Sequence, residues 1–392
     1  MNYRLSRIAA ICGGKFSGCD SEVRSVVTDS RSLSCELGCS PMFVAMHGAN
    51  HDSHDFIADM QGRGVRAFLV ERGVEASSCT GECGFVQVDN AIEALQRLAA
   101  YHRAQFRGTV VGITGSNGKT VIKEWIAEEL PAGMKCYRSP KSYNSQLGVP
   151  LSVLMIEGDE QLALIEAGIS KPGEMARLER IIRPDVVVFI SIGDAHQENF
   201  LNLEQKCDEK MVLAHRAETI VYHSHYDPLG RMIASRFAGR KLCDAAACPE
   251  VPEAVIGNAA SRRNAQIVEA FCAAMGYPAP SFTEAPEVAM RLEVKDGIND
   301  SVLINDAYNL DLNSLALALD YLHSVALNRR RTLVLSDISQ SGLSDDELYG
   351  RVAGMVARAG IDFLIGIGPR LKRYAALFAC DKEFFATTDE CI

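Results

Sequence analysis

Short apolar runs that alternate with longer amphipathic stretches give the middle of the chain a clear pattern. The runs are rich in β-branched residues and bounded by glycine or charged residues, and helix-like segments such as residues 121–130 lie between them. Strands that alternate with helices in this way are typical of a parallel sheet covered by helices. The predicted strands of this sheet are residues 109–114, 162–168, 185–193 and 219–223.

The segment before this region has strands and helices of its own. Residues 41–46 and 66–71 are apolar enough to form buried strands, and residues 91–106 have the periodicity of an amphipathic helix. The polar end of that helix directly precedes the first strand of the middle region. We therefore expect a domain boundary near residue 105.

A third region follows a stretch rich in proline and alanine near residues 278–286. It opens with the strand-like residues 301–306, and further strands alternate there with predicted helices over 313–325 and 345–360. The region therefore repeats the α/β alternation on a smaller scale. Its further strands are predicted at 332–337 and 363–368, and the α/β chain as a whole is expected to have domains at 1–105, 106–300 and 301–392.

Length and charge agree with this division and exclude some classes of protein. A chain of 392 residues is long enough for about two to three domains. Its formal charge of −10 argues against a nucleic-acid-binding protein, which normally presents a basic face. No secretory leader opens the chain, and no apolar run approaches the roughly 20 residues that span a bilayer. We therefore expect a cytoplasmic protein that binds neither nucleic acid nor a membrane.

The chain has 13 cysteines, which are expected to be reduced thiols in the cytosol. A zinc site is the alternative interpretation. It would combine the pairs Cys35/Cys39 and Cys79/Cys83 with a nearby histidine, although this spacing is not that of a standard zinc finger. The candidate histidines are His47, His51 and His54.

A glycine-rich loop, GITGSNGKT at residues 112–120, follows the first strand of the middle region. Backbone N–H groups at the start of the next helix can bind phosphate oxygens there. The ammonium of Lys119 would contact the β- and γ-phosphates, and the hydroxyl of Thr120 would bind Mg²⁺. The usual phosphate loop has a glycine at the position of Ile113, so the alternative is an ordinary glycine-rich turn. The predicted ATP-binding residues of the loop are Gly115, Ser116, Asn117, Gly118, Lys119 and Thr120.

Three more polar residues lie where chemistry is expected, near the ends of buried strands. Glu166 ends the second strand of the sheet, His196 follows the third, and Lys210 lies fourteen residues after His196. Each has an ordinary alternative interpretation when taken alone. Glu166 can be a solvated acid, His196 a structural histidine and Lys210 an exposed lysine on a helix.

Together with the loop, these residues resemble the Mur ligases, the enzymes that add amino acids to the peptidoglycan precursor. The resemblance extends over nearly the whole chain and includes residues 28–31, 43–56, 144–150, 166–178 and 192–200. In that family, glycines spaced as in this loop are normal. The resemblance implies a three-domain α/β fold, with a central P-loop parallel-sheet ATPase domain, a UDP-binding N-terminal domain and a Rossmann-like C-terminal domain.

The resemblance also implies roles for individual residues. Lys119, Glu166, His196 and Lys210 would be catalytic. Thr120 would bind a first Mg²⁺ on the triphosphate, and Glu166, His196 and Lys210 would hold a second metal ion near the acyl phosphate. Lys210 corresponds to a carbamylated lysine in the family. A carbamate offers the anionic oxygen that Mg²⁺ prefers, whereas an ammonium would repel the ion. Further ATP contacts would come from Asn264, Arg291, Asp306 and Asn309, and contacts to the UDP-linked substrate from Ser30, Arg31, His51 and Asn144.

Within the family, the segment DAYNLDLNS at residues 306–314 is most similar to the members that add D-alanyl-D-alanine. The D-N-P-R string of the diaminopimelate-adding members does not occur. The resemblance therefore implies an ATP-dependent carboxylate–amine ligase that joins D-alanyl-D-alanine to UDP-N-acetylmuramoyl-tripeptide through an acyl phosphate.

The sequence also departs from the family pattern. Ala260 and Ser261 replace a His-Asn pair, Val121 replaces the second threonine of the loop, and Ser53 replaces a glycine. The first replacement resembles a subgroup in which the ligase is fused to an alanine racemase. The chain is expected to end within the family's last domain, which would be incomplete, and we expect no racemase activity from it.

Two alternative functions remain open at this point. The first is another ligase of the same architecture, either a different Mur ligase or a folylpolyglutamate synthetase, although the latter lacks a UDP-binding domain of this kind. The second is a non-catalytic, truncated fragment that only binds nucleotide or UDP precursor.

Overall fold

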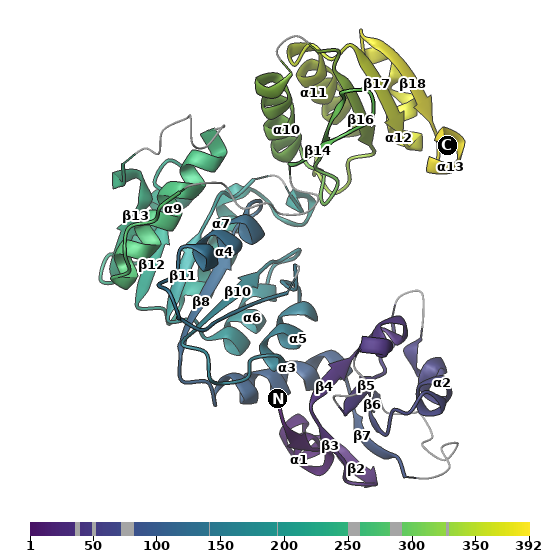
Figure 1. The fold of residues 1–392 in the computed structure, drawn as a ribbon, viewed down its shortest axis with the longest axis vertical. Helices are drawn as coiled ribbons and strands as arrows, with labels where there is room; N and C mark the ends of the chain where they lie inside the picture. The colour runs from purple at the N-terminus through teal and green to yellow at the C-terminus, as the bar shows by residue number, and fades with distance from the viewer. Residues whose placement is uncertain are drawn as a thin grey trace.

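The computed structural model describes residues 1–35, 40–48, 52–71, 82–140, 142–193, 195–249, 259–282, 292–326 and 329–392. Figure 1 shows three groups of sheet and helix, which follow one another in chain order along the long axis. We call them the N-terminal, middle and C-terminal lobes. None of the helices in the described ranges is long and apolar enough to cross a membrane.

The N-terminal lobe contains a five-stranded sheet in the order β2-β7-β6-β5-β4, in which only the β2–β7 pair is antiparallel. The predicted strands at 41–46 and 66–71 are confirmed as β5 and β6. The strands are β2 (Lys15–Gly18), β4 (Ser25–Val27), β5 (Pro41–Val44), β6 (Ala67–Glu71) and β7 (Gly84–Val88), with the small pair β1 (Tyr3–Arg4) and β3 (Glu22–Val23) beside them. The helices are α1 (Leu5–Cys12), α2 (Ile57–Gly62) and α3 (Ala91–Arg103), with 3-10 turns η1 (Ser30–Cys35) and η3 (Ser53–Phe56).

The middle lobe is a six-stranded sheet in the order β13-β12-β11-β8-β10-β9, and all its pairs are parallel. The four predicted strands are confirmed, and β9 and β13 are additional strands at the two edges. The strands are β8 (Thr109–Thr114), β9 (Cys136–Arg138), β10 (Leu162–Ala167), β11 (Val186–Phe189), β12 (Thr219–Tyr222) and β13 (Lys241–Asp244). The helices are α4 (Lys119–Glu128), α5 (Gly148–Leu154), α6 (Glu174–Ile182), α7 (Leu203–Met211), α8 (Leu229–Arg236) and α9 (Ala259–Met275).

Helices cover both faces of the middle sheet. Along β10, Leu162 and Leu164 pack into a core with α4 and α9, whereas Ala163 and Ile165 pack into a second core with α5 and α6. Because neighbouring side chains of a strand point to opposite faces, both faces of β10 are buried. Water can therefore reach the sheet mainly at the ends of its strands. Because β8, β10 and β11 are parallel, the loops that follow them lie at the same end of the sheet.

Helix α3 connects the first two lobes. It packs against α5 and α6, and its Leu95 and Leu98 belong to the same apolar core as Ile165 and Ile182. The helix that was predicted to end the first domain therefore also covers the middle sheet. The domain boundary near residue 105 stays a prediction.

The C-terminal lobe contains a three-stranded parallel sheet, β16-β17-β18, packed with α10 and α11. The predicted strand over 301–306 forms β15, but β15 pairs antiparallel with β14 in a separate two-stranded ribbon. The strands are β14 (Glu293–Asp296), β15 (Val302–Asn305), β16 (Thr332–Ser336), β17 (Phe363–Ile367) and β18 (Asp381–Phe385). The helices are α10 (Leu312–Val325), α11 (Asp345–Arg358), α12 (Pro369–Arg373) and α13 (Thr388–Cys391).

Candidate active site

The glycine-rich loop joins the carboxyl end of β8 to the start of α4. Gly118 caps α4 with a φ of +86°, a left-handed conformation that glycine adopts without strain. The Ser116 N–H donates to the carbonyl oxygen of Ser191 at 2.7 Å, and the Gly193 N–H donates to Oγ of Ser116 at 2.9 Å. These bonds fix the loop to the segment after β11. The start of α4, whose first N–H groups have no carbonyl partner within the helix, is therefore held in place beside this segment, as a phosphate-binding site requires.

Two lysines donate to one carbonyl group of this loop. Nζ of Lys119 lies 3.0 Å from the oxygen of Gly115, and Nζ of Lys210 lies 3.1 Å from the same oxygen. Lys210 extends from α7 and is almost completely buried, so the alternative of an exposed lysine is wrong. Burial, and then the nearby cations Lys119 and Lys206, hold the pKa of Lys210 well below its usual value.

Glu166 lies at the carboxyl end of β10 and is fully buried, so the alternative of a solvated acid is also wrong. Its Oε1 accepts a hydrogen bond from Nζ of Lys123 at 3.0 Å, and its Oε2 accepts a longer one from Nδ2 of Asn144 at 3.4 Å. Lys123 belongs to α4, one helical turn after Lys119.

His196 follows β11 and has a φ of +60°. Its Nδ1 is buried and has no hydrogen-bond partner among the described residues. Burial lowers the pKa of His196, and the cations Lys206 and Lys210 lower it further. The imidazole is therefore neutral near pH 7. Lys206, itself buried, shapes this segment by donating to the carbonyl oxygens of Gly193, at 2.5 Å, and of Ala195.

A cavity of about 320 Å³ is lined by eight of the predicted site residues. Its lining comes from the glycine-rich loop, the ends of β10 and β11, α7 and the segment before α10. Glu166 lies behind this lining and reaches it through Asn144. The lining residues are Gly115, Ser116, Asn117, Lys119, Asn144, Ser145, Gly168, Ile169, Ser170, Ala195, His196, Lys210, Tyr308 and Asn309.

Two further predicted residues lie beside the loop. Thr120 is buried, with its Oγ1 3.4 Å from Oγ of Ser142. Asn264 extends from α9 toward Gly118, where a Cβ added to the glycine would lie 3.7 Å from the Asn264 amide nitrogen. Both positions are therefore compatible with the nucleotide-binding roles predicted for these residues.

The C-terminal lobe contacts the loop through a residue that the sequence prediction missed. The buried carboxylate of Asp311 accepts hydrogen bonds from Nδ2 of Asn117 at 3.1 and 3.3 Å, and it caps α10. An acidic residue three positions before Ser314, at the start of an apolar run, was the available signal. Of the predicted residues in this lobe, Asn309 lines the cavity, and Asp306 accepts a hydrogen bond from the Leu292 N–H at 3.2 Å.

The predicted UDP-binding residues are placed only in part. Ser30 and Arg31 lie in η1, and the exposed Arg31 pairs with Asp29 at 2.8 Å, which lowers the pKa of Asp29 to about 2. Neither of the two lines the cavity described above. His51 and Arg291 lie outside the described residues.

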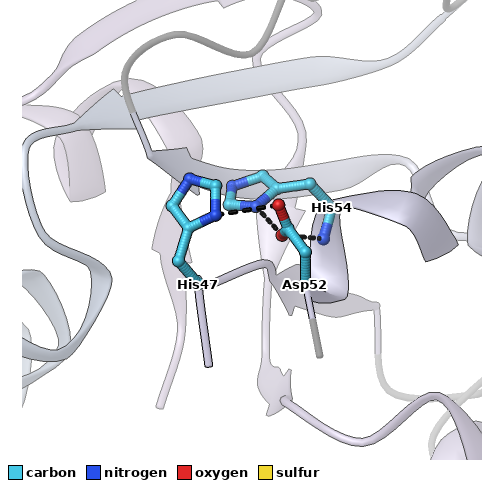
Figure 2. A group of neighbouring side chains, drawn as sticks. All are labelled: His47, Asp52 and His54. Atoms are coloured by element: carbon cyan, nitrogen blue, oxygen red, sulfur yellow. Dashed lines mark hydrogen bonds and ion pairs between the residues drawn. The ribbon is translucent and has the colours of Figure 1, made fainter. Parts of the chain in front are cut away.

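Figure 2 shows His47 and His54 directed at the carboxylate of Asp52, with Nδ1–oxygen distances of 2.8 and 2.6 Å. The Glu71 N–H donates to Nε2 of His54 at 3.1 Å, so the proton of a neutral His54 must be on Nδ1. His54 then has no free lone pair for a metal, and the group is a hydrogen-bond network. Of the cysteines in the zinc alternative, Cys83 is buried in an apolar core, and Cys39 and Cys79 lie outside the described residues.

Comparison with known sequences identifies the middle of the chain. Residues 113–247 match the Mur ligase middle domain. A UDP-N-acetylmuramoyl-tripeptide–D-alanyl-D-alanine ligase of Bacillus subtilis is 25% identical over 376 residues, which cover 88% of this chain and 80% of the relative.

Solved structures share the fold. A MurF structure from Acinetobacter baumannii superposes with a TM-score of 0.80 at 20% identity and covers 100% of this chain and 91% of its own. MurF from Thermotoga maritima in complex with ADP has a TM-score of 0.73 at 21% identity, covering 93% and 88% of the two chains. FolC of Escherichia coli in complex with DHPP and ADP is less similar, with a TM-score of 0.51 at 15% identity over 76% of this chain and 84% of its own.

Proposed function

Because this chain belongs to the Mur ligase family, we propose that it uses ATP to join D-alanyl-D-alanine to UDP-N-acetylmuramoyl-tripeptide. The observation that carries the proposal is the single cavity in which Lys119, His196 and Lys210 meet. The phosphate loop alone is compatible with many reactions. A neutral histidine and a buried lysine opposite the loop match the family's metal-assisted ligase chemistry and have no role in a simple nucleotide-binding module.

The reaction must activate a carboxylate, because its oxygen is a poor leaving group. A carboxylate oxygen of the tripeptide attacks the γ-phosphorus of ATP, and the bond to ADP breaks. The amine of D-alanyl-D-alanine then attacks the carbonyl carbon of the acyl phosphate, phosphate leaves, and the amine proton passes to solvent. Phosphoryl transfer of this kind asks the protein mainly for positioning and for stabilisation of negative charge.

The residues of the cavity can supply both. Lys119 and the N–H groups at the start of α4 would hold the triphosphate, while Tyr308 and Asn309 of the C-terminal lobe would help to exclude water from the acyl phosphate. The family resemblance supports further contacts from predicted residues on either side. ATP would also be contacted by Asn264, Arg291, Asp306 and Asn309, and the UDP-linked substrate by Ser30, Arg31, His51 and Asn144.

The site also suits Mg²⁺. The buried Nδ1 of His196 is free to accept a metal, and Oε2 of Glu166 makes only a 3.4 Å contact. Thr120 would bind a first ion on the triphosphate, and Glu166, His196 and Lys210, the last as a carbamate, would hold a second ion. When bound, Mg²⁺ would offset the charge on the transferred phosphoryl group.

Carbamylation of Lys210 has its own test. We expect mass spectrometry of the native protein in bicarbonate buffer to show the added carbamate, and Lys210→Ala to remove it. The variant should lose turnover and recover part of it with a short-chain carboxylate. Full turnover of Lys210→Ala without any addition would rule out this role.

Two further proposals concern the domains and the place of the reaction. Residues 1–105, 106–300 and 301–392 would act as the UDP-precursor-binding, ATP-binding and dipeptide-binding domains. The reaction would take place in the cytoplasm, where the family's nucleotide-linked precursors are made.

The decisive experiment combines the protein with ATP, Mg²⁺, UDP-N-acetylmuramoyl-tripeptide and D-alanyl-D-alanine. We expect mass spectrometry to show the pentapeptide product together with ADP, and Lys119→Ala to abolish both. Parallel reactions with diaminopimelate or with folate and glutamate test the alternative ligases. Binding of ADP without any product would instead support the non-catalytic alternative.

A further inference from the structure

Lys123 is a fully buried lysine that the chemistry above does not use. Its ammonium donates to the carbonyl oxygen of Ser139 at 2.6 Å and to Oε1 of Glu166 at 3.0 Å, and it lies 3.2 Å from Oε1 of Glu124. A lysine is almost never fully buried unless its charge is paired. The pairing with Glu166 is therefore the main reason why Lys123 can occupy this position.

The two oxygens of Glu166 have different surroundings. Oε1 is bound by Lys123, which does not line the cavity, whereas Oε2 faces Asn144, which does. Ser139 also restrains the glutamate, because its Oγ accepts the Glu166 N–H at 3.3 Å while its carbonyl oxygen binds Lys123. Lys123 and Ser139 thus fix the carboxylate with Oε2 on the cavity side.

We propose that Lys123 is a positioning residue that fixes Oε1 of Glu166 and leaves Oε2 to receive a divalent cation. The inference rests on the proposed function, because Glu166 is assigned there to the cation. Lys123 has a second effect in the absence of the cation. A buried carboxylate without a partner is very unfavourable, and the ammonium supplies that partner until the cation arrives.

The proposal predicts that Mg²⁺ can replace the missing charge in a variant without the ammonium. Lys123→Met keeps the length of the side chain but leaves Glu166 without its partner. We expect this variant to melt at a lower temperature than the wild type, and Mg²⁺ without nucleotide to restore part of the loss. If Lys123 acted only through packing, the loss would be the same with and without Mg²⁺, and that result would overturn the proposal.

A double variant tests the same coupling where Lys123→Met alone does not fold. If Lys123 acts through Glu166, then Lys123→Met should cost little once the carboxylate is removed. We therefore expect Glu166→Gln and Lys123→Met/Glu166→Gln to melt at similar temperatures, and neither to respond to Mg²⁺. A double variant much less stable than Glu166→Gln would contradict the proposal.

Arg103 offers a matched control at the other end of the strands, where their amino ends lie. Its buried guanidinium lies 3.6 Å from the carboxylate of Asp185, which directly precedes β11 and is 55% exposed. Arg103→Met also removes a buried cation beside a carboxylate, but water can solvate the carboxylate of Asp185. We expect it to lower the melting temperature with no recovery in Mg²⁺, and a recovery equal to that of Lys123→Met would overturn the site-specific interpretation.

Kinetics separate this inference from the proposed function. With MgATP saturating, we expect the half-saturating free Mg²⁺ of Lys123→Met to fall about tenfold, because a nearby positive charge is lost. Its kcat should fall, since Glu166 is less firmly held, while the Kd for ADP without Mg²⁺ stays unchanged. A wild type that makes no pentapeptide refutes the proposed function. An active wild type whose Lys123→Met variant has unchanged Mg²⁺ dependence refutes the role of Lys123.

Discussion

Gly115 is the position where a single methyl group should disturb the site most. A Cβ added there would lie 2.0 Å from Cγ1 of Ile190 and 3.0 Å from the carbonyl oxygen of Ser191. Carbon atoms normally approach to about 3.5 Å, so the loop or Ile190 would have to move by roughly 1.5 Å. Overpacking of this kind costs about 1–3 kcal/mol. Movement of Gly115 also displaces the carbonyl oxygen that binds both Lys119 and Lys210.

If this cost falls on the nucleotide-binding conformation, Gly115→Ala should weaken ADP binding by roughly 5- to 150-fold, because 1.4 kcal/mol corresponds to a factor of ten. Isothermal titration calorimetry with ADP measures this directly. Gly350→Ala is the control, since a Cβ there meets nothing within 4 Å. It should bind ADP like the wild type and be slightly more stable, because alanine favours a helix interior.

The double variant Gly115→Ala/Ile190→Ala identifies the cause. Loss of the isoleucine side chain removes the clash but leaves a cavity, so the protein should lose about 2–5 kcal/mol of unfolding free energy. ADP affinity should nevertheless return toward the wild-type value. Wild-type affinity in Gly115→Ala, or no recovery in the double variant, would show that the close approach of Gly115 to Ile190 does not set the loop geometry.

Two further predictions concern other parts of the molecule. Asp311→Ala should lower the unfolding free energy by about 0.5–2 kcal/mol, because α10 loses its cap, whereas Asp311→Asn should lower it much less. Urea unfolding measures both variants, and an equal decrease in unfolding free energy for the two would exclude the capping role. Burial lowers the pKa of His102, His196 and His223 below 6.5, so the unfolded chain binds more protons than the folded chain at acidic pH. The unfolding free energy should therefore be highest above pH 6.5 and fall as the pH drops below it. His223→Gln should make this fall of the unfolding free energy with pH less steep. An unchanged pH dependence in the variant would show that His223 does not contribute to it.

In the middle lobe, the strands that the sequence predicted are those buried on both faces. β8, β10 and β11 read as continuous apolar runs because helices cover both sides of the sheet. β9 and β13 were missed because they are edge strands, short and only partly buried, and the sequences CYR and KLCD have no such run. β15 was recognised as a strand, but its partner β14 could not be inferred from a local pattern.

The site was predictable where a residue lies in a motif or directly after a buried strand. The loop residues, Glu166 and His196 have such signals. Lys123 and Lys206 have none, because a lysine on a helix is normally exposed and only tertiary packing buries these two. In hindsight, the spacing of four residues between Lys119 and Lys123 places both on one face of α4, toward the end of the sheet.

The distribution of charge at the site has a consequence for the order of binding. Lys119 and Lys210 donate to the same carbonyl oxygen, so their ammonium groups repel each other when both are protonated, while the charge of Glu166 is already offset by Lys123. An added cation would meet this excess of positive charge, whereas a triphosphate would be attracted by it and would reduce the repulsion. The same excess opposes protonation of Lys210 and His196 until an anion is bound. As long as Lys210 carries no carbamate, electrostatics therefore favour entry of the metal together with the nucleotide.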